Sequence, residues 1–247
     1  MARLEIHVTG SGSAIRRAER GILVLQAHSQ QLATAEEASA TVTGTAHKLR
    51  NIIAPYCPQD EETGRTKENA PIAHYSMSTL DTTSHRERIG RPTGEPRLTE
   101  PVKYETTYSA RVDLKIKFSD FNLLDTLATQ FSAMQNVRIQ QIDWRLTDAT
   151  LASIEGGARK KAAQNALQRA RDYAEVFANL SPEEAAAKVK AIDVKESQYL
   201  PQSTRPRLHY GKGQRMQVVS RDDVALTFEP EDVSFEVKVD GKFVVEV

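Results

Sequence analysis

The feature that most constrains the fold is an alternating stretch at residues 108–118. Apolar side chains occupy every second position, and polar or charged side chains occupy the positions between them. This period of two is typical of an antiparallel strand that has one face in a core and the other in water. The apolar face consists of Tyr108, Ala110, Val112, Leu114, Ile116 and Phe118. A chain that folds around this strand must cover that face with other elements.

A helix and another strand follow this stretch directly. Ser119 or Asp120 is placed to cap a helix, and apolar residues then recur every three or four positions, as on the buried side of a helix. These residues are Leu124, Leu127, Ala128, Phe131 and Met134. A second strand is predicted at residues 137–146. The three elements form a strand, helix, strand unit.

The first segment of the chain predicts two strands joined by a turn. Alternation at residues 4–8 and an apolar run at residues 21–27 indicate strands, which we expect to pair. Glycine and serine at residues 9–14 predict the turn. The run Gly10-Ser11-Gly12 lacks the third glycine of a dinucleotide-binding loop and leads into a strand, so we interpret it as a turn.

A helix is predicted after the second strand. Thr34 and Glu37 have the spacing of a capping box, and Pro55 brings the helix to its end. Gly44 lies inside this helix, where glycine costs about 1 kcal/mol relative to alanine. We therefore expect a close approach of this helix to a neighbouring strand at Gly44.

The second half of the chain contains the most regular helix, at residues 155–179. Its apolar stripe is mostly alanine, which allows the helix backbone to lie close to a sheet. A short helix is predicted after Ser181, because a serine cap is followed by proline. Further strands are predicted at residues 72–83 and 189–199.

The last segment predicts one long strand. Asp240 followed by Gly241 is a hairpin signal, but a tight turn there would place apolar residues opposite charged ones. As one strand, the segment has an apolar face that is broken only at Gly241. Because an exposed apolar edge of this length favours aggregation, we expect a second copy to cover it in a homo-oligomer. The candidate interface is Val233, Phe235, Val237, Val239, Phe243, Val245 and Val247.

Two stretches rich in proline, glycine or basic residues, at about residues 86–101 and 201–215, predict long loops. The strands on either side of the first loop are expected to pair in one sheet. A domain boundary there would leave the first half with too few apolar residues for a core. We therefore predict a single domain over residues 1–247.

Composition narrows the class of protein. Lys and Arg number 33 and Asp and Glu number 33, so no net charge draws the whole molecule to nucleic acid or to an anionic membrane. A single cysteine excludes an internal disulfide. The sequence has no run of roughly 20 apolar residues to span a bilayer and no apolar secretory signal. These features predict a cytoplasmic location.

No catalytic, cofactor-binding or metal-binding pattern is recognisable in the sequence. The histidines lack the paired spacing of metal ligands. Cys57 follows a helix and precedes a proline, and we interpret it as a structural residue. Phe118 and Trp144 are interpreted as core aromatics on neighbouring strands. We therefore expect no cofactor and no metal.

Four segments occur in a distinctive order. They are Val-Thr-Gly-Ser-Gly at residues 8–12, the strand at 108–118 followed by Ser-Asp-Phe, Ile-Asp-Trp-Arg-Leu at 142–146, and the alanine helix. Together they resemble the SIMPL-domain family. The resemblance implies an α+β fold with an antiparallel sheet backed by helices, and it matches the long C-terminal strand. Bacterial members lie in the cell envelope and some assemble into rings or cages, and the animal member binds a receptor-associated kinase.

The resemblance implies no enzyme activity. We expect a self-assembling interaction or scaffold protein, which the resemblance links to stress response or kinase signalling, with a kinase as a candidate partner. The alternative is a module that binds nucleic acid or another anion through Arg159, Lys160, Lys161, Arg205, Arg207, Lys212 and Arg215. A third hypothesis is an enzyme, which would require a pocket that raises the pKa of a carboxylate.

Overall fold

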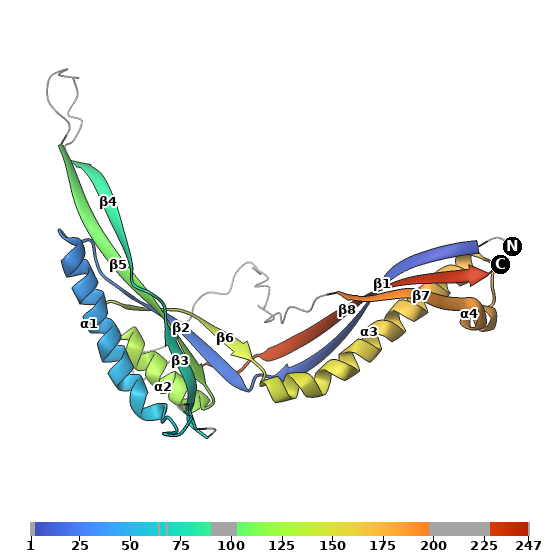
Figure 1. The fold of residues 1–247 in the computed structure, drawn as a ribbon, viewed down its shortest axis with the longest axis horizontal. Coiled ribbons are helices and arrows are strands. Elements are labelled where there is room, and N and C mark those ends of the chain that lie inside the picture. The colour runs from blue at the N-terminus through green and yellow to red at the C-terminus, as the bar shows by residue number, and fades with distance from the viewer. Residues whose placement is uncertain (1–2, 64, 68, 90–102, 198–227, 247) are drawn as a thin grey trace, which may run out of the picture. The chain divides into compact units, whose positions relative to one another are not determined.

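The computed structural model describes residues 3–63, 65–67, 69–89, 103–197 and 228–246 (Figure 1). The chain divides into two compact units, each assembled from separate segments. Unit 1 comprises Met1–Glu19, Trp144–Arg215 and Pro230–Val247, and unit 2 comprises Arg20–Asp143 and Met216–Glu229. Both units combine a sheet with helices, and the α+β class with antiparallel sheets is confirmed.

Unit 2 is built on the alternating strand. This strand, β5 (Lys103–Phe118), pairs with β2 (Arg20–His28) on one side and with both β3 (Ile72–Met77) and β4 (Asp81–Ile89) on the other. Beyond β2 lies β6 (Val137–Arg145), at the far side of the sheet. The apolar face of β5 is buried and its polar face is not, as the period of two predicts.

Two helices cover the apolar face of this sheet. They are α1 (Ala35–Ile53), which a short 3-10 turn η1 (Ala54–Tyr56) extends, and α2 (Phe121–Ser132). One continuous core joins the helices to the strands, and its largest fully buried side chains are Leu23, Leu25, Leu49, Ile53, Ile72, Leu114, Ile116, Phe118, Leu124, Leu127 and Phe131. Unit 2 therefore has its own hydrophobic core.

The helix caps lie at two of the predicted residues, Thr34 and Asp120. The hydroxyl of Thr34 accepts a hydrogen bond from the backbone N–H of Glu37, and the carboxylate of Asp120 accepts from the first turn of α2. The close approach predicted at Gly44 is wrong, because a Cβ atom built there meets nothing within 4 Å. The glycine therefore faces open space.

Two predicted boundaries in unit 2 differ from the structure. The strand predicted at residues 72–83 is divided into β3 and β4, because the chain turns between Met77 and Asp81 and both segments pair with β5. The loop predicted from residue 86 begins later, since β4 continues to Ile89. The rest of that loop, and the whole of the loop at 201–215, lie outside the described residues.

Unit 1 is a three-stranded antiparallel sheet with two helices. Its central strand is β8 (Asp232–Glu246), which pairs with β1 (Arg3–Arg17) on one side and β7 (Val189–Ser197) on the other. The long helix α3 (Asp148–Phe177) packs on β1 and β8, and the short helix α4 (Pro182–Lys188) precedes β7. The prediction that the chain ends in one long strand is confirmed.

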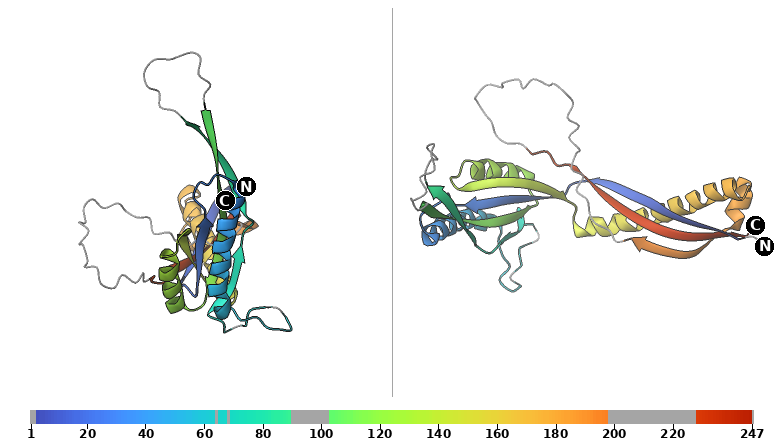
Figure 2. Two further views of the ribbon diagram at one scale, coloured as in Figure 1. Left: turned by 90° about the vertical axis from the view of Figure 1, so that its left-hand side faces the viewer. Right: turned by 90° about the horizontal axis from the view of Figure 1, so that it is seen from above.

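The backbones of β1 and α3 touch at two glycines. A Cβ atom at Gly10 would overlap the carbonyl oxygen of Ala162 and lie 2.7 Å from the Cβ of Ala166. A Cβ atom at Gly12 would overlap the carbonyl oxygen of Ala158 and lie 2.5 Å from the amide nitrogen of Ala162. Figure 2 shows α3 following the length of β1 and β8, which this small-residue contact makes possible.

This contact explains why the turn predicted at residues 9–14 is wrong. The segment lies inside β1 and pairs with β8 without a break, from Thr9 opposite Asp240 to Ala14 opposite Phe235. Its glycines are required for helix packing rather than for a turn. The pairing predicted between the first two strands is also wrong, because β1 pairs with β8 and β2 pairs with β5.

The helix α3 begins at Asp148, earlier than the residue 155 predicted from its alanine stripe. Thr147 caps it by accepting a hydrogen bond from the N–H of Thr150. The carboxylate of Glu19 then accepts from the N–H and hydroxyl of Thr147, at 2.8 and 2.6 Å. A carboxylate at a helix N-terminus is stabilised by the free N–H groups there, so this first turn is well anchored.

The two compact units refine the prediction of a single domain. Neither unit is one continuous stretch of chain, since each combines segments that are separated in the sequence by parts of the other. The single domain over residues 1–247 stays a prediction.

We predict that Gly10→Ala destabilises the protein by about 1 to 3 kcal/mol, the usual cost of overpacking, because the added methyl group collides with the backbone of α3. Chemical denaturation followed by circular dichroism measures the change. If the chain is a single cooperative domain, the whole transition shifts to lower denaturant concentration.

The matched control is Gly157→Ala in α3 itself, where a Cβ atom meets nothing within 4 Å. There the same substitution should stabilise the protein by about 0.5 to 1 kcal/mol, because alanine favours helix over glycine. Equal effects of the two substitutions would contradict the close contact. A loss of only part of the transition in Gly10→Ala would show that unit 1 unfolds separately.

Candidate interaction surface

The outer edge of β1 is covered by polar side chains of α3. Arg169 donates a hydrogen bond to the carbonyl oxygen of Thr9 at 2.6 Å, and the side-chain oxygen of Asn165 accepts from the N–H of Ser11 at 3.1 Å. A third residue of α3, Lys161, donates to the carbonyl oxygen of Ser13 at 3.5 Å. These three residues are spaced four apart, so they form one row along the helix.

This row has a direct consequence for association. An unpaired strand edge is a template on which another strand can pair, because its N–H and C=O groups lack partners. Between Thr9 and Ser13 the edge groups already bind Arg169, Asn165 and Lys161. This part of β1 is therefore closed to another strand.

The opposite edge, β7, has different surroundings. Among the described residues β7 pairs with β8 alone. Its register shifts between Ala191 and Asp193, and the intervening Ile192 is 46% exposed. Val194 is 57% exposed. The sheet of unit 1 thus presents two exposed apolar side chains on its β7 edge.

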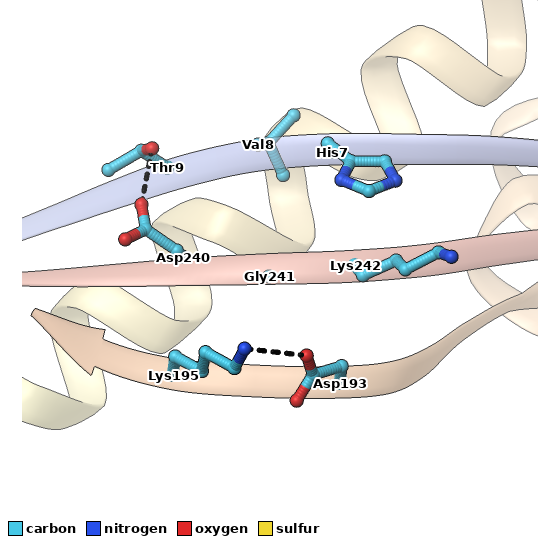
Figure 3. Close-up of a pocket in the computed structure, with 8 residues that line it drawn as sticks. All are labelled: His7, Val8, Thr9, Asp193, Lys195, Asp240, Gly241 and Lys242. Atoms are coloured by element: carbon cyan, nitrogen blue, oxygen red, sulfur yellow. Dashed lines mark hydrogen bonds and ion pairs between the residues drawn. The ribbon is translucent and has the colours of Figure 1, made fainter.

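A shallow cleft of about 360 Å³ lies on the face of this sheet that points away from α3 (Figure 3). Strands β1, β8 and β7 all contribute side chains. The lining consists of His7, Val8, Thr9, Asp193, Lys195, Asp240, Gly241 and Lys242. The register explains the set, because His7 lies opposite Lys242 and Thr9 lies opposite Asp240.

The polar groups of this cleft bind one another. Asp240 accepts a hydrogen bond of 2.6 Å from the hydroxyl of Thr9, and Lys195 pairs with Asp193 at 3.6 Å. Lys242 pairs with Glu5 at 2.8 Å. Its hydrogen bond, and then its charge, hold the pKa of Glu5 below the ordinary value. The cleft is therefore lined by paired acidic and basic side chains, and β7 forms one side of it.

Comparison with protein-family models matches residues 6–243 to SIMPL, described as a protein of unknown function (DUF541). The chain belongs to the SIMPL family. The match covers both units and all the motifs on which the resemblance rested. No curated protein matches this SIMPL chain. Within the described ranges, none of its helices is long and apolar enough to cross a membrane.

The seven residues predicted as an oligomer interface lie elsewhere than expected. Six of them, Val233, Phe235, Val237, Val239, Phe243 and Val245, are buried inside unit 1, and Val247 lies outside the described residues. The premise of an exposed edge is wrong, because β8 is paired on both sides and α3 packs on it. The apolar face is long because a helix of similar length lies along it.

The basic residues of the anion-binding alternative divide into two groups. Arg159 binds Glu196 at 3.0 Å and also pairs with Glu155, and these contacts raise its pKa, with Glu196 contributing most. Lys161 contacts β1, and Lys160 is exposed. Arg205, Arg207, Lys212 and Arg215 lie outside the described residues. The described cations on α3 are thus partly used within unit 1.

The remaining predicted positions are buried. Cys57 is 7% exposed in the core of unit 2, with its sulfur 3.4 Å from the hydroxyl oxygen of Thr66. Phe118 and Trp144 are buried as predicted, but their strands are not neighbours, because β2 lies between β5 and β6. A search of the described residues finds no group of His, Cys, Asp or Glu that could hold a metal ion.

Sequence reasoning missed the residues that define the two edges. Of the row formed by Lys161, Asn165 and Arg169, the sequence analysis considers only Lys161, as a candidate anion ligand, although the spacing of four in the row matches that of the alanine stripe beside it. Ile192 and Val194 were assigned to a strand but not to a surface. The available signal for a sheet edge was this pair of apolar residues in a strand that also contains several charged residues.

We predict that Lys242→Gln raises the pKa of Glu5 toward the ordinary value, because the partner that stabilises the carboxylate is removed. The lowered pKa contributes stability above the ordinary pKa, and that contribution is lost as the pH falls through the lowered pKa. Titration of the Glu5 carboxyl by NMR measures the shift.

Lys195→Gln is the control, since Lys195 also lines the cleft but pairs with Asp193. It should leave the pKa of Glu5 where it is in the wild type. A pKa of Glu5 that responds equally to both substitutions, or to neither, would contradict the specific pairing of Glu5 with Lys242.

Proposed function

We propose that this SIMPL chain is a non-enzymatic interaction protein that self-associates through the edge strand β7. The observation that carries the proposal is the contrast between the two edges of unit 1. Between Thr9 and Ser13 the β1 edge is closed by side chains of α3, whereas β7 has exposed Ile192 and Val194 and no second strand among the described residues. Pairing with another copy covers both the backbone groups and the apolar side chains.

The charges of β7 favour a second copy as the partner. In an antiparallel pair with Val194 on the two-fold axis, Asp193 lies opposite Lys195 of the second copy, and the same contact occurs twice. Two isologous contacts of opposite charge then flank an apolar contact between the two valines. The edge is thus self-complementary in both charge and hydrophobicity.

The closed edge of β1 limits the assembly. If both edges of a sheet were free, copies would add without end, as in fibres. Because Arg169, Asn165 and Lys161 occupy the middle of the β1 edge, from Thr9 to Ser13, pairing through β7 yields a closed pair of unit 1 sheets. Such a dimer carries two copies of each remaining surface of the chain. Two copies of a binding surface suit a scaffold in stress response or kinase signalling.

We predict that Val194→Lys converts the associated protein to monomer, because two lysines would then face one another across the two-fold axis. Light scattering coupled to gel filtration, at micromolar concentration, measures the mass. The substitution is at a side chain that is 57% exposed, so thermal unfolding of the monomer should change little.

Ile15→Lys is the matched control. Ile15 is also an apolar residue of an edge strand in unit 1 and is also 57% exposed, but it lies on β1. This variant should keep the mass of the wild type. A wild type that is monomeric at these concentrations would sink the proposal, and so would loss of association in Ile15→Lys but not in Val194→Lys.

A further inference from the structure

A second cleft, of about 460 Å³, lies within unit 2 on the polar face of its sheet. Side chains from four strands converge there. The lining consists of Gln26, His28, Ser29, Asp81, Thr83, His85, Ser109, Ala110, Arg111 and Arg138. This volume falls within the range of small-molecule sites, which is about 300 to 1,000 Å³.

The arginine and histidine side chains of this cleft outnumber its carboxylates. It is lined by two arginines and two histidines, but by a single carboxylate, that of Asp81. Asp81 is bound by Arg111, whose Nε and terminal nitrogen both lie 2.8 Å from the same carboxylate oxygen. Asp113, outside the lining, accepts a hydrogen bond of 2.8 Å from Gln26. The carboxylates near the cleft are therefore already bound.

Two side chains in the cleft have polar atoms that lack a hydrogen-bond partner among the described residues. Nδ1 of His28 is buried and has no hydrogen-bond partner within the described part of the chain. A buried nitrogen in that state costs free energy unless a ligand or water supplies the partner. Arg138, on β6, makes no hydrogen bond or ion pair with another described residue and is exposed. Both residues line the same cleft from different strands.

Hydroxyl groups extend the donor set. Ser29 is 6% exposed, and its oxygen accepts from the N–H of Ala110 at 2.9 Å, which leaves its own hydrogen to donate. Ser109 lies 3.1 Å from Nε2 of His85. Donors placed on several sides of a cleft suit a tetrahedral oxyanion, and a guanidinium group matches phosphate geometry.

We propose that this cleft is a binding site for a small molecule that bears a phosphate group. Arg138 and His28 contact the phosphate oxygens, with Ser29 and Ser109 as further donors. Arg111 stays paired with Asp81 and lends its remaining N–H groups. The site is independent of association through β7, since every residue of it belongs to unit 2.

The test titrates the full chain with inorganic phosphate at constant ionic strength, with chloride as the balancing anion. The ring nitrogens of His28 and His85 are observed by long-range ¹H–¹⁵N NMR. Saturable shifts of the His28 signals are expected. Arg138→Gln should weaken phosphate binding about tenfold, the effect of losing a charge-assisted hydrogen bond.

Lys115→Gln is the matched control, because Lys115 is an exposed cation on the polar face of β5 that does not line the cleft. It should bind phosphate as the wild type does. If Arg138→Gln proves unstable, His28→Leu removes the unpartnered ring at similar volume and should also weaken binding. Shifts that do not saturate, equal binding by Arg138→Gln and Lys115→Gln, or acetate binding as tight as phosphate binding would overturn the proposal.

Discussion

The contact between Gly10 and Gly12 of β1 and the alanines of α3 is the constraint on which unit 1 depends. The two backbones lie so close that a methyl group at either glycine would overlap a carbonyl oxygen of the helix. At this distance the polar residues next to the alanine stripe reach the outer edge of β1, where Asn165 and Arg169 bind backbone groups. One small-residue contact thus both packs the helix and closes an edge.

The same contact determines which edge of the unit 1 sheet remains available for the proposed association. With β1 closed between Thr9 and Ser13 and β8 in the centre, β7 is left as the edge that presents Ile192 and Val194 beside backbone groups that no side chain of α3 is seen to bind among the described residues. Larger side chains in place of these glycines and alanines would hold α3 farther from the sheet. The polar side chains of α3 would then no longer reach β1. The proposed association through β7 is therefore a consequence of packing on the other side of the sheet.

Periodicity predicted the elements whose apolar residues are large. The alternating strand β5, the caps at Thr34 and Asp120, and the long strand β8 all follow from spacing and local hydrogen-bonding capacity. The middle of β1 escaped prediction because Gly10 and Gly12 are also turn residues. A signal did exist. Two residues of a strand span about 6.7 Å, and four residues of a helix span about 6 Å. Glycines two residues apart in a strand can therefore lie against alanines four residues apart in a helix.

Neither the proposed interface nor the clefts could be predicted from local pattern. An apolar strand face looks the same whether a helix of its own chain or a second copy covers it, and β8 was assigned to the wrong one. The cleft of unit 2 draws His28, His85 and Arg138 from three strands that are far apart in the sequence. Only the pairing of those strands with β5 and β2 brings the side chains together.

Amide hydrogen exchange at several protein concentrations tests the central claim most directly, because it observes both edges of unit 1 in one sample. The account predicts that protection of the β7 amides rises with concentration as copies pair. It also predicts that the Ser11 amide, which binds Asn165, is equally protected at every concentration. Concentration-independent exchange in β7, or protection of Ser11 that appears only at high concentration, would contradict it.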